Sequence, residues 1–207
     1  MSIFDINTYV TLTSGALPVE QDEFSLTPIP AQTDAQPGDV FIKIGDVVLH
    51  SVGNEQPIKA LISLGKPEKI VANTFRRAAC ETAKWLIRHH IQRVAVDVSQ
   101  FDAFDVPLAL QAFCEGLILG SYRFLRHKQP AITYKPVQVT LRGDVTRHAA
   151  LDQLVERVRI IAGAVNLTRD WANEPANIVN PITLAERAEA LAKAHGLKCT
   201  ILDDKQL

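Results

Sequence analysis

The run Val94-Ala95-Val96-Asp97-Val98 lies between two helical stretches and decides the class of the fold. After Pro67 the apolar residues recur with a period of 3.6, which predicts an amphipathic helix before this run. Val106 to Leu119 follows it, is of helical length and is apolar nearly all round, as in a deeply packed helix. Pro136 to Leu141 has the composition of a further strand. Strands that alternate with helices predict an α/β layered domain with a parallel or mixed sheet.

The first third of the chain is rich in strand-like segments. Tyr9 to Thr13 has strand composition, and Gly15 follows it as a breaker. Two strand-like runs between Val40 and His50 flank a Gly-Asp turn and predict a hairpin, and Ala60 to Leu64 predicts a central strand. The stretch from Leu17 to Pro37 contains four prolines, which favours a loop or an irregular edge.

The last third is predicted to be helical. A long helix begins at Thr146 and breaks at Asn173-Glu174-Pro175, where the proline denies the helix its continuation. Asn180-Pro181 opens a last helix that ends at Gly196, and Lys198 to Leu202 begins a strand. The apolar stripe of the long helix contains Leu151, Leu154, Val155, Val158, Ile161, Ala162 and Val165.

Composition excludes several classes of protein. The chain has 207 residues, of which 47% are hydrophobic, so it can bury a core. Its 22 basic and 23 acidic residues give a net charge of -1, which argues against a protein that coats nucleic acid or an anionic membrane. Three scattered cysteines build neither a disulfide framework nor a metal knuckle. We see no signal peptide and no membrane-spanning stretch, and therefore expect a soluble intracellular protein.

Two groups of residues are candidates for metal ligands. His89 and His90 are adjacent and point about 100° apart on a helix, so one histidine at a buried edge and one in solvent is the favoured alternative. Asp97, Asp102 and Asp105 follow a predicted parallel strand, where α/β folds hold ligands and three carboxylates could bind a divalent cation. Capping and turn formation are the favoured alternative, with Asp105 as a helix cap.

Basic residues and a cysteine complete the candidates. A first helix carries several basic residues that could contact phosphates, although Glu81 on the same face makes a solvated surface the preferred interpretation. These basic residues, with one that follows the helix, are Arg76, Arg77, Lys84, Arg88 and Arg93. Cys114 lies on an apolar helix and is expected to be an inert buried thiol. No phosphate-binding loop, nucleophile elbow or zinc-binding helix motif occurs, so the residues alone show no active site.

Two longer stretches carry a family resemblance. The first is Glu115-Gly116-Leu117-Ile118-Leu119-Gly120-Ser121-Tyr122-Arg123-Phe124. The second is Leu167-Thr168-Arg169-Asp170-Trp171-Ala172-Asn173-Glu174-Pro175-Ala176-Asn177-Ile178-Val179-Asn180-Pro181. In this order, separated by a long amphipathic helix, they resemble the leucyl aminopeptidase family of cytosolic metallopeptidases, peptidase family M17. In that family the first belongs to the non-catalytic N-terminal domain and the second opens the catalytic domain.

The resemblance implies a domain plan. Residues 1–145 would form an N-terminal domain similar to macro domains, 146–172 a connecting helix, and 173–207 the beginning of a truncated catalytic domain. Asn173 to Asn177 would then be a structural hinge. Family members are hexamers in the cytoplasm that remove N-terminal residues, preferably leucine, from peptides with two divalent metals, manganese, zinc or magnesium. Their ligands, a lysine, aspartates and a glutamate, would lie beyond Leu207.

No catalytic, cofactor-binding or metal-binding residue is therefore assigned within this chain. Asp203 and Asp204 precede the first ligand motif of the family and are not expected to be ligands. The chain itself is expected to be inactive, with a structural and oligomerisation role and no bound cofactor. The alternative is a module that binds a nucleotide, such as ADP-ribose, or DNA. The absence of a glycine-rich phosphate loop and the near-zero net charge argue against it.

Overall fold

A computed structural model describes residues 9–16, 24–29, 40–44, 47–52, 59–102, 104–128 and 134–206. The chain divides into two compact units, Met1–Leu167 and Thr168–Leu207. Each unit is described separately below.

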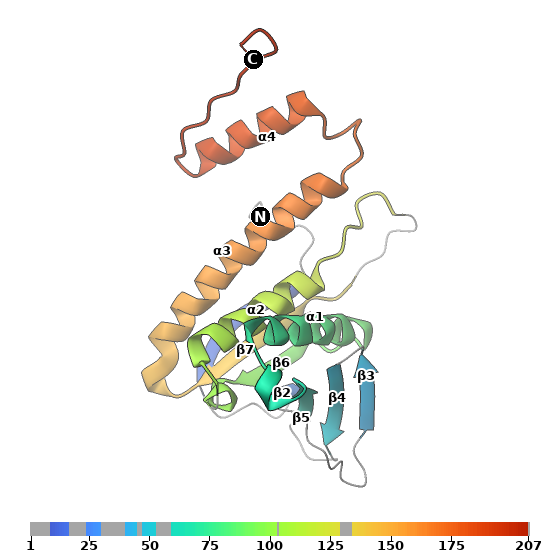
Figure 1. Ribbon diagram of the computed structural model, residues 1–207, viewed down its shortest axis with the longest axis vertical. Helices are drawn as coiled ribbons and strands as arrows, with labels where there is room; N and C mark the ends of the chain where they lie inside the picture. The colour runs from blue at the N-terminus through green and yellow to red at the C-terminus, as the bar shows by residue number, and fades with distance from the viewer. Residues whose placement is uncertain are drawn as a thin grey trace. The chain divides into compact units, whose positions relative to one another are not determined.

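The first unit is built on a sheet of seven strands, in the order β1-β7-β6-β2-β5-β4-β3 (Figure 1). The strands are β1 Val10–Ala16, β2 Phe24–Ile29, β3 Val40–Ile44, β4 Val47–Val52, β5 Lys59–Ser63, β6 Arg93–Asp97 and β7 Val137–Gly143. The first five strands of this order are parallel, whereas β4 and β3 are antiparallel to their neighbours. The predicted hairpin, the central strand at β5 and the mixed α/β class are thereby confirmed.

One face of the sheet forms the core. The register places Leu12 beside Val139, Val94 beside Val139, and Leu26 beside Val96, so that alternate residues of neighbouring strands share this face. All of these side chains are buried. This shared register explains why the first unit has one continuous hydrophobic cluster.

Strand β2 lies inside the stretch that we predicted to be a loop or irregular edge, so that prediction was wrong. Its proline, Pro28, pairs in register with Ile62 of β5. Pairing of β2 with β6 on the other side ends at Leu26. A proline is tolerated in a strand where the backbone has no neighbour on one side, because no ladder hydrogen bond is lost there.

Gly15 was predicted to end the first strand, yet it lies within β1. A Cβ atom at this position would lie 2.9 Å from the Thr140 methyl and 3.0 Å from the Arg142 Nη1 atom of β7. The glycine therefore gives room to a neighbouring side chain instead of breaking the strand.

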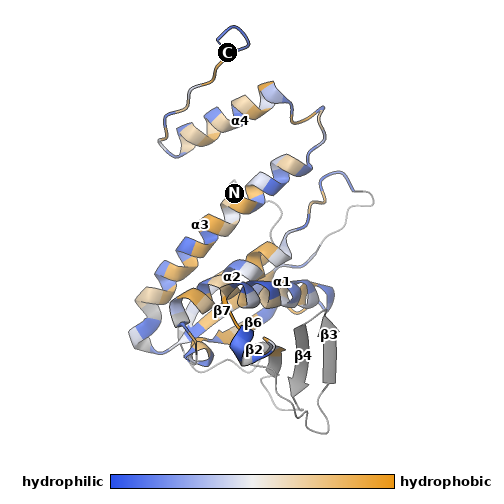
Figure 2. Cartoon of the chain, viewed as in Figure 1, coloured by the Kyte–Doolittle hydropathy of each residue, from blue (hydrophilic) through white to orange (hydrophobic). Residues whose placement is uncertain are grey.

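Helices α1 Ala72–Arg88 and α2 Val106–Ser121 lie side by side on one face of the sheet (Figure 1). Helix α1 buries one side, including Phe75 and Leu86, whereas α2 is buried over most of its length. Figure 2 shows this contrast, with hydrophilic colour along α1 and mostly hydrophobic colour along α2. Short 3-10 helices occur at η1 Pro67–Lys69, η2 Val98–Phe101 and η3 Val145–Arg147. Both predicted helices are confirmed.

Helix α3, His148–Asn173, follows β7 as predicted. Within the first unit it buries Leu151, Val158 and Ala162 in the core, and Asp152 accepts a hydrogen bond from Ser14 of β1. Ile161 and Val165 were predicted to face the core, but they are 42% and 43% exposed. The helix is therefore apolar on a second side that the described residues of this unit leave exposed.

The second unit contains the last turns of α3 and helix α4, Pro181–Ala194. Asn180 caps α4 by accepting hydrogen bonds from the backbone nitrogens of Ile182 and Thr183, each at 3.1 Å. Gly196 follows with a φ of +66°, a conformation that favours glycine. The predicted start and end of this helix are confirmed.

The strand predicted from Lys198 to Leu202 is absent, because the structure assigns no strand to these residues. No described strand lies in this unit, and an extended segment needs a neighbour to form a ladder. Among the helices of the described residues, none is sufficiently long and apolar to cross a membrane.

Candidate functional site

Helices α1 and α2 meet at the two glycines of the stretch that carries the family resemblance. A Cβ atom at Gly116 would lie 2.3 Å from the Arg76 carbonyl oxygen, and one at Gly120 would lie 2.4 Å from the Cys80 carbonyl oxygen. These distances are shorter than any real Cβ contact, so only glycine allows the two backbones to approach this closely. Gly116 and Gly120 thus fix the packing of the two helices.

A polar network lies beside this contact. Arg76 donates two hydrogen bonds to Glu115 Oε2, from Nε at 3.0 Å and from Nη2 at 2.7 Å. Gln111 donates to Glu115 Oε1 at 2.8 Å. The Glu115 side chain is only 8% exposed, and these three donations satisfy its buried carboxylate. Arg76 was predicted to lie on a solvated face, so this is a correction: it reaches across to α2.

The other candidates on α1 and α2 have structural roles or are solvated. Lys84 pairs with Glu81 at 2.5 Å on the surface, as the solvated interpretation predicts. Cys114 is fully buried, and its burial, followed by the nearby Glu115 charge, raises the pKa of its thiol far above the usual range. The expected burial of Cys114 is confirmed, and a thiol that stays protonated is a poor nucleophile.

His89 and His90 follow Arg88, the last residue of α1, so the two histidines do not share a helix face. Both histidines are exposed, which corrects the prediction that one lies at a buried edge. His89 stacks on Trp85 with ring centroids 4.5 Å apart. His90 has a φ of +59° and accepts the left-handed conformation that ends the helix.

The three predicted carboxylates have separate partners. Asp97 accepts hydrogen bonds from Ser99 N at 2.9 Å and from Ser99 Oγ at 2.8 Å, and so caps η2. Asp102 forms an ion pair with Arg147. Asp105 occupies the N-cap position of α2, but its side chain makes no capping hydrogen bond, so this part of the prediction was wrong. In the part of the chain that the structure describes, no group of three His, Cys, Asp or Glu residues could hold a metal.

A charged pair and an aspartate lie at the carboxyl ends of β6 and β7. Arg147 Nη1 donates to Asp102 Oδ1 at 2.8 Å, and Nη2 donates to Oδ2 at 3.0 Å. Asp144 accepts from Thr146 N at 2.9 Å, and its Oδ2 lies 3.7 Å from Arg147 Nε. The hydrogen bond from Arg147 lowers the pKa of Asp102, and a hydrogen bond from the Thr146 hydroxyl is the main cause that lowers the pKa of Asp144. The hydrogen bond that Arg147 donates to Asp102 also raises the pKa of Arg147.

A cavity of about 360 Å³ opens between this pair and the first turns of α2 and α3. Its apolar lining consists of Val98, Pro107, Leu110, Ala150, Leu151 and Leu154. Asp102 was a candidate from the sequence, whereas its partner Arg147, 45 residues away in the chain, was not. The sequence signal that could have indicated this region is Gly143-Asp144, where a buried strand ends. The carboxyl ends of neighbouring parallel strands meet at one edge of the sheet, so residues that follow them lie close together.

The geometry thus defines an α/β domain in which Asp97 caps η2, and Glu115 and Asp102 form ion pairs with Arg76 and Arg147. Comparison with known proteins assigns this domain to a family. The family model described as "Cytosol aminopeptidase family, N-terminal domain" matches residues 43–131. A probable cytosol aminopeptidase from Aquifex aeolicus is 32% identical over 80% of this chain and 33% of its own length. One from Syntrophotalea carbinolica is 36% identical over 80% of this chain and 35% of its own length.

The chain belongs to the cytosol, or leucyl, aminopeptidase family and represents its N-terminal portion. It spans about a third of the length of these curated relatives. Solved structures share the fold: a mutant of tomato leucine aminopeptidase has a TM-score of 0.69 at 14% identity, covering 98% of this chain and 46% of that one. The bottromycin maturation enzyme BotP has a TM-score of 0.68 at 21% identity, covering 89% and 40%.

Proposed function

We propose that this chain is the non-catalytic N-terminal part of a metal-dependent aminopeptidase that removes N-terminal residues, preferably leucine, from peptides in the cytoplasm. The observation that carries the proposal is the match of residues 43–131 to the N-terminal domain of the family. The relatives named cytosol aminopeptidases are about three times longer than their match to this chain and support a catalytic part elsewhere in the parent.

The two divalent metals of the parent, manganese, zinc or magnesium, do not fit the described residues of this chain. One solved relative is the bottromycin maturation enzyme in complex with manganese. In this chain the carboxylates at the ends of the strands are engaged by Ser99, Thr146 and Arg147, and none of them converges on a common point with two further ligands. We therefore assign no catalytic, cofactor-binding or metal-binding role to any residue that the structure describes, and derive no step of the hydrolysis through them.

The role proposed for the chain is structural, including assembly of a homohexamer. Apolar side chains on the second side of α3 support it, because Ile160, Ile161 and Val165 are 56%, 42% and 43% exposed. An exposed apolar group of this kind is typical of a surface that another part of an assembly covers. The proposed plan keeps 1–145 as the N-terminal domain, 146–172 as a connecting helix and 173–207 as the start of the catalytic domain.

Hydrolysis of leucine p-nitroanilide tests the proposal. The purified chain, supplied with manganese, zinc or magnesium, is expected to release nitroaniline no faster than a blank that contains the metal alone. Turnover above the blank would contradict the assignment of the chain as non-catalytic. No observation favours the alternative of a nucleotide- or DNA-binding module.

A further inference from the structure

The cavity beside the Asp102–Arg147 pair has the features of a site for a small ligand. Its volume of about 360 Å³ is at the small end of ligand pockets, which range over roughly 300–1,000 Å³. Six of its eight lining residues are apolar, and all eight belong to the first unit. Its lining residues lie near the beginnings of α2 and α3 and after the carboxyl ends of β6 and β7. This is the edge at which α/β sheets hold ligands.

The charged residues of the cavity lining are Asp102 and Arg147. Asp102 is 47% exposed and Arg147 37% exposed, so the pair lies at the solvent side, whereas Leu110 and Leu151 are buried. A ligand that fills the cavity therefore meets apolar side chains with its body and a carboxylate and a guanidinium with its polar end.

Both members of the pair retain hydrogen-bonding capacity. A guanidinium has five N–H groups, of which Arg147 uses two on Asp102. The Asp102 carboxylate has about four lone-pair positions, of which those two bonds occupy two. A ligand that carries an ammonium and a carboxylate on one carbon atom can therefore bond to Asp102 with the first and to Arg147 with the second.

We propose that this cavity binds a free apolar amino acid of about the size of leucine. Its side chain contacts the lining of Leu110, Leu151 and Leu154, its carboxylate accepts from Arg147, and its ammonium donates to Asp102. The zwitterion carries one negative and one positive group, which match the Arg147 guanidinium and the Asp102 carboxylate of the lining.

A free apolar amino acid is also what an aminopeptidase releases. The site would then let the N-terminal part of the enzyme respond to the product of the reaction. This link rests on the proposed function, whereas the binding itself does not. Leucine binding is measured on the chain without any metal or substrate, so an absence of binding would not contradict the proposed function. A result that contradicts the proposed function would, in turn, leave the measured binding unchanged.

Titration of the chain with four compounds, followed by amide NMR shifts, tests the proposal. L-Leucine is expected to bind with a dissociation constant on the order of 1 mM, as few atoms make contact. Leucinamide, 4-methylpentanoate and glycine each lack one of the three recognised groups, and each is expected to bind at least about tenfold more weakly. The proposal would be overturned if leucinamide bound as well as leucine, because the site would then also accept the N-terminus of a peptide. It would likewise be overturned if 4-methylpentanoate bound as well as leucine.

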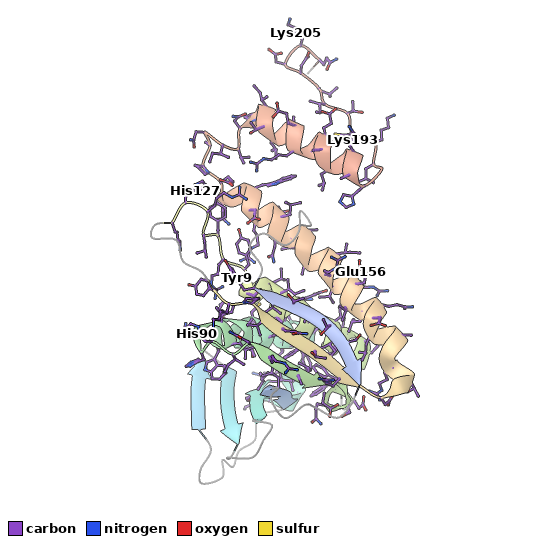
Figure 3. All side chains as sticks on the ribbon, turned by 180° about the vertical axis from the view of Figure 1, so that it is seen from behind. Tyr9, His90, His127, Glu156, Lys193 and Lys205 are labelled. Atoms are coloured by element: carbon purple, nitrogen blue, oxygen red, sulfur yellow. The ribbon has the colours of Figure 1, made fainter. Side chains whose placement is uncertain are left out.

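Two variants and a matched control locate the site. Arg147→Gln and Asp102→Asn are each expected to weaken leucine binding at least about tenfold. Arg159→Gln removes an exposed arginine of α3 that pairs with Glu156 at 3.0 Å and does not line the cavity. This variant is expected to bind leucine as the parent chain does. Figure 3 labels Glu156 on the side of α3 away from β1 and β7. Circular dichroism establishes that each variant is folded, and unchanged leucine binding by both folded site variants would overturn the proposal.

Discussion

Helix α2 has two very different neighbours. Against α1 it packs backbone to backbone, with Gly116 and Gly120 under carbonyl oxygens of the other helix. Beside the beginning of α3 it leaves a cavity of about 360 Å³ that is lined by Pro107 and Leu110 from α2 itself. The first contact has no room for a methyl group, whereas the second has room for a small ligand. Stability and binding are thus assigned to opposite ends of one helix.

Substitution at the tight contact is expected to have the largest effect. Gly116→Ala or Gly120→Ala places a methyl group within 2.4 Å of a backbone oxygen that cannot move alone, and should lower the free energy of unfolding by about 3 kcal/mol or more. Gly65→Ala is the control, because its Cβ has free space and only the φ of +83° is unfavourable, at about 1 kcal/mol. Urea denaturation measures both, and equal losses would show that the helices are not in contact as described.

The polar network beside that contact is expected to contribute less. Arg76→Ala leaves the Glu115 carboxylate, 8% exposed, with Gln111 as its remaining donor among the partners described above, and should cost about 2 kcal/mol. Lys84→Ala removes an exposed ion pair on the same helix and should cost about 0.5 kcal/mol or less. If the two losses in thermal denaturation are the same, the buried carboxylate does not depend on Arg76.

Filling the cavity should change stability little and binding strongly. Ala150→Leu adds a larger side chain to the cavity lining, where space is available, so the free energy of unfolding should stay within about 0.5 kcal/mol. Leucine binding should be lost. Ala149→Leu is the matched control, since Ala149 is exposed and does not line the cavity. Calorimetric titration with leucine distinguishes them, and retained binding in Ala150→Leu would contradict the position of the site.

The smallest effect concerns the charge at the cavity rim. Arg147 lowers the pKa of Asp102 below its ordinary value of 3.8, so the charged form is favoured in the folded state. The stabilisation is therefore fully present above the ordinary value and is lost as the pH falls through the lowered pKa. In a carboxyl-carbon NMR titration, Arg147→Gln should raise the pKa of Asp102, whereas Arg159→Gln should raise that of Glu156 instead. A pKa of Asp102 that does not respond to Arg147→Gln would contradict the ion pair.

Local signals predicted the parts of the fold that depend on neighbouring residues. The apolar run that forms α2, the cap at Asn180 and the hairpin, predicted from Val40 to His50, were all evident from sequence. Strand β2 was missed because a proline is a local sign of a loop. Whether a strand tolerates the proline depends instead on a tertiary feature, the point at which pairing with β6 ends. Gly15 was misinterpreted for the same reason. A glycine is needed there because of side chains on another strand, β7, which lie too close for a Cβ atom.

The candidate site was only half predictable. Asp102 was evident at the end of a buried strand, but its partner Arg147 comes from the beginning of another element 45 residues later. Gly116 and Gly120 were recognised as part of a family stretch, although their spacing alone did not indicate which helix they contact. Such pairings are set by tertiary packing, which the sequence pattern of one element does not contain.

The metal content of the purified chain tests the central claim most directly, because a non-catalytic N-terminal part should not hold the metals of the reaction. After incubation with manganese or zinc and removal of free metal by gel filtration, mass spectrometry of the elements should find no more metal per chain than in a blank. One or two equivalents of tightly bound metal would contradict the account and place part of the metal centre within residues 1–207.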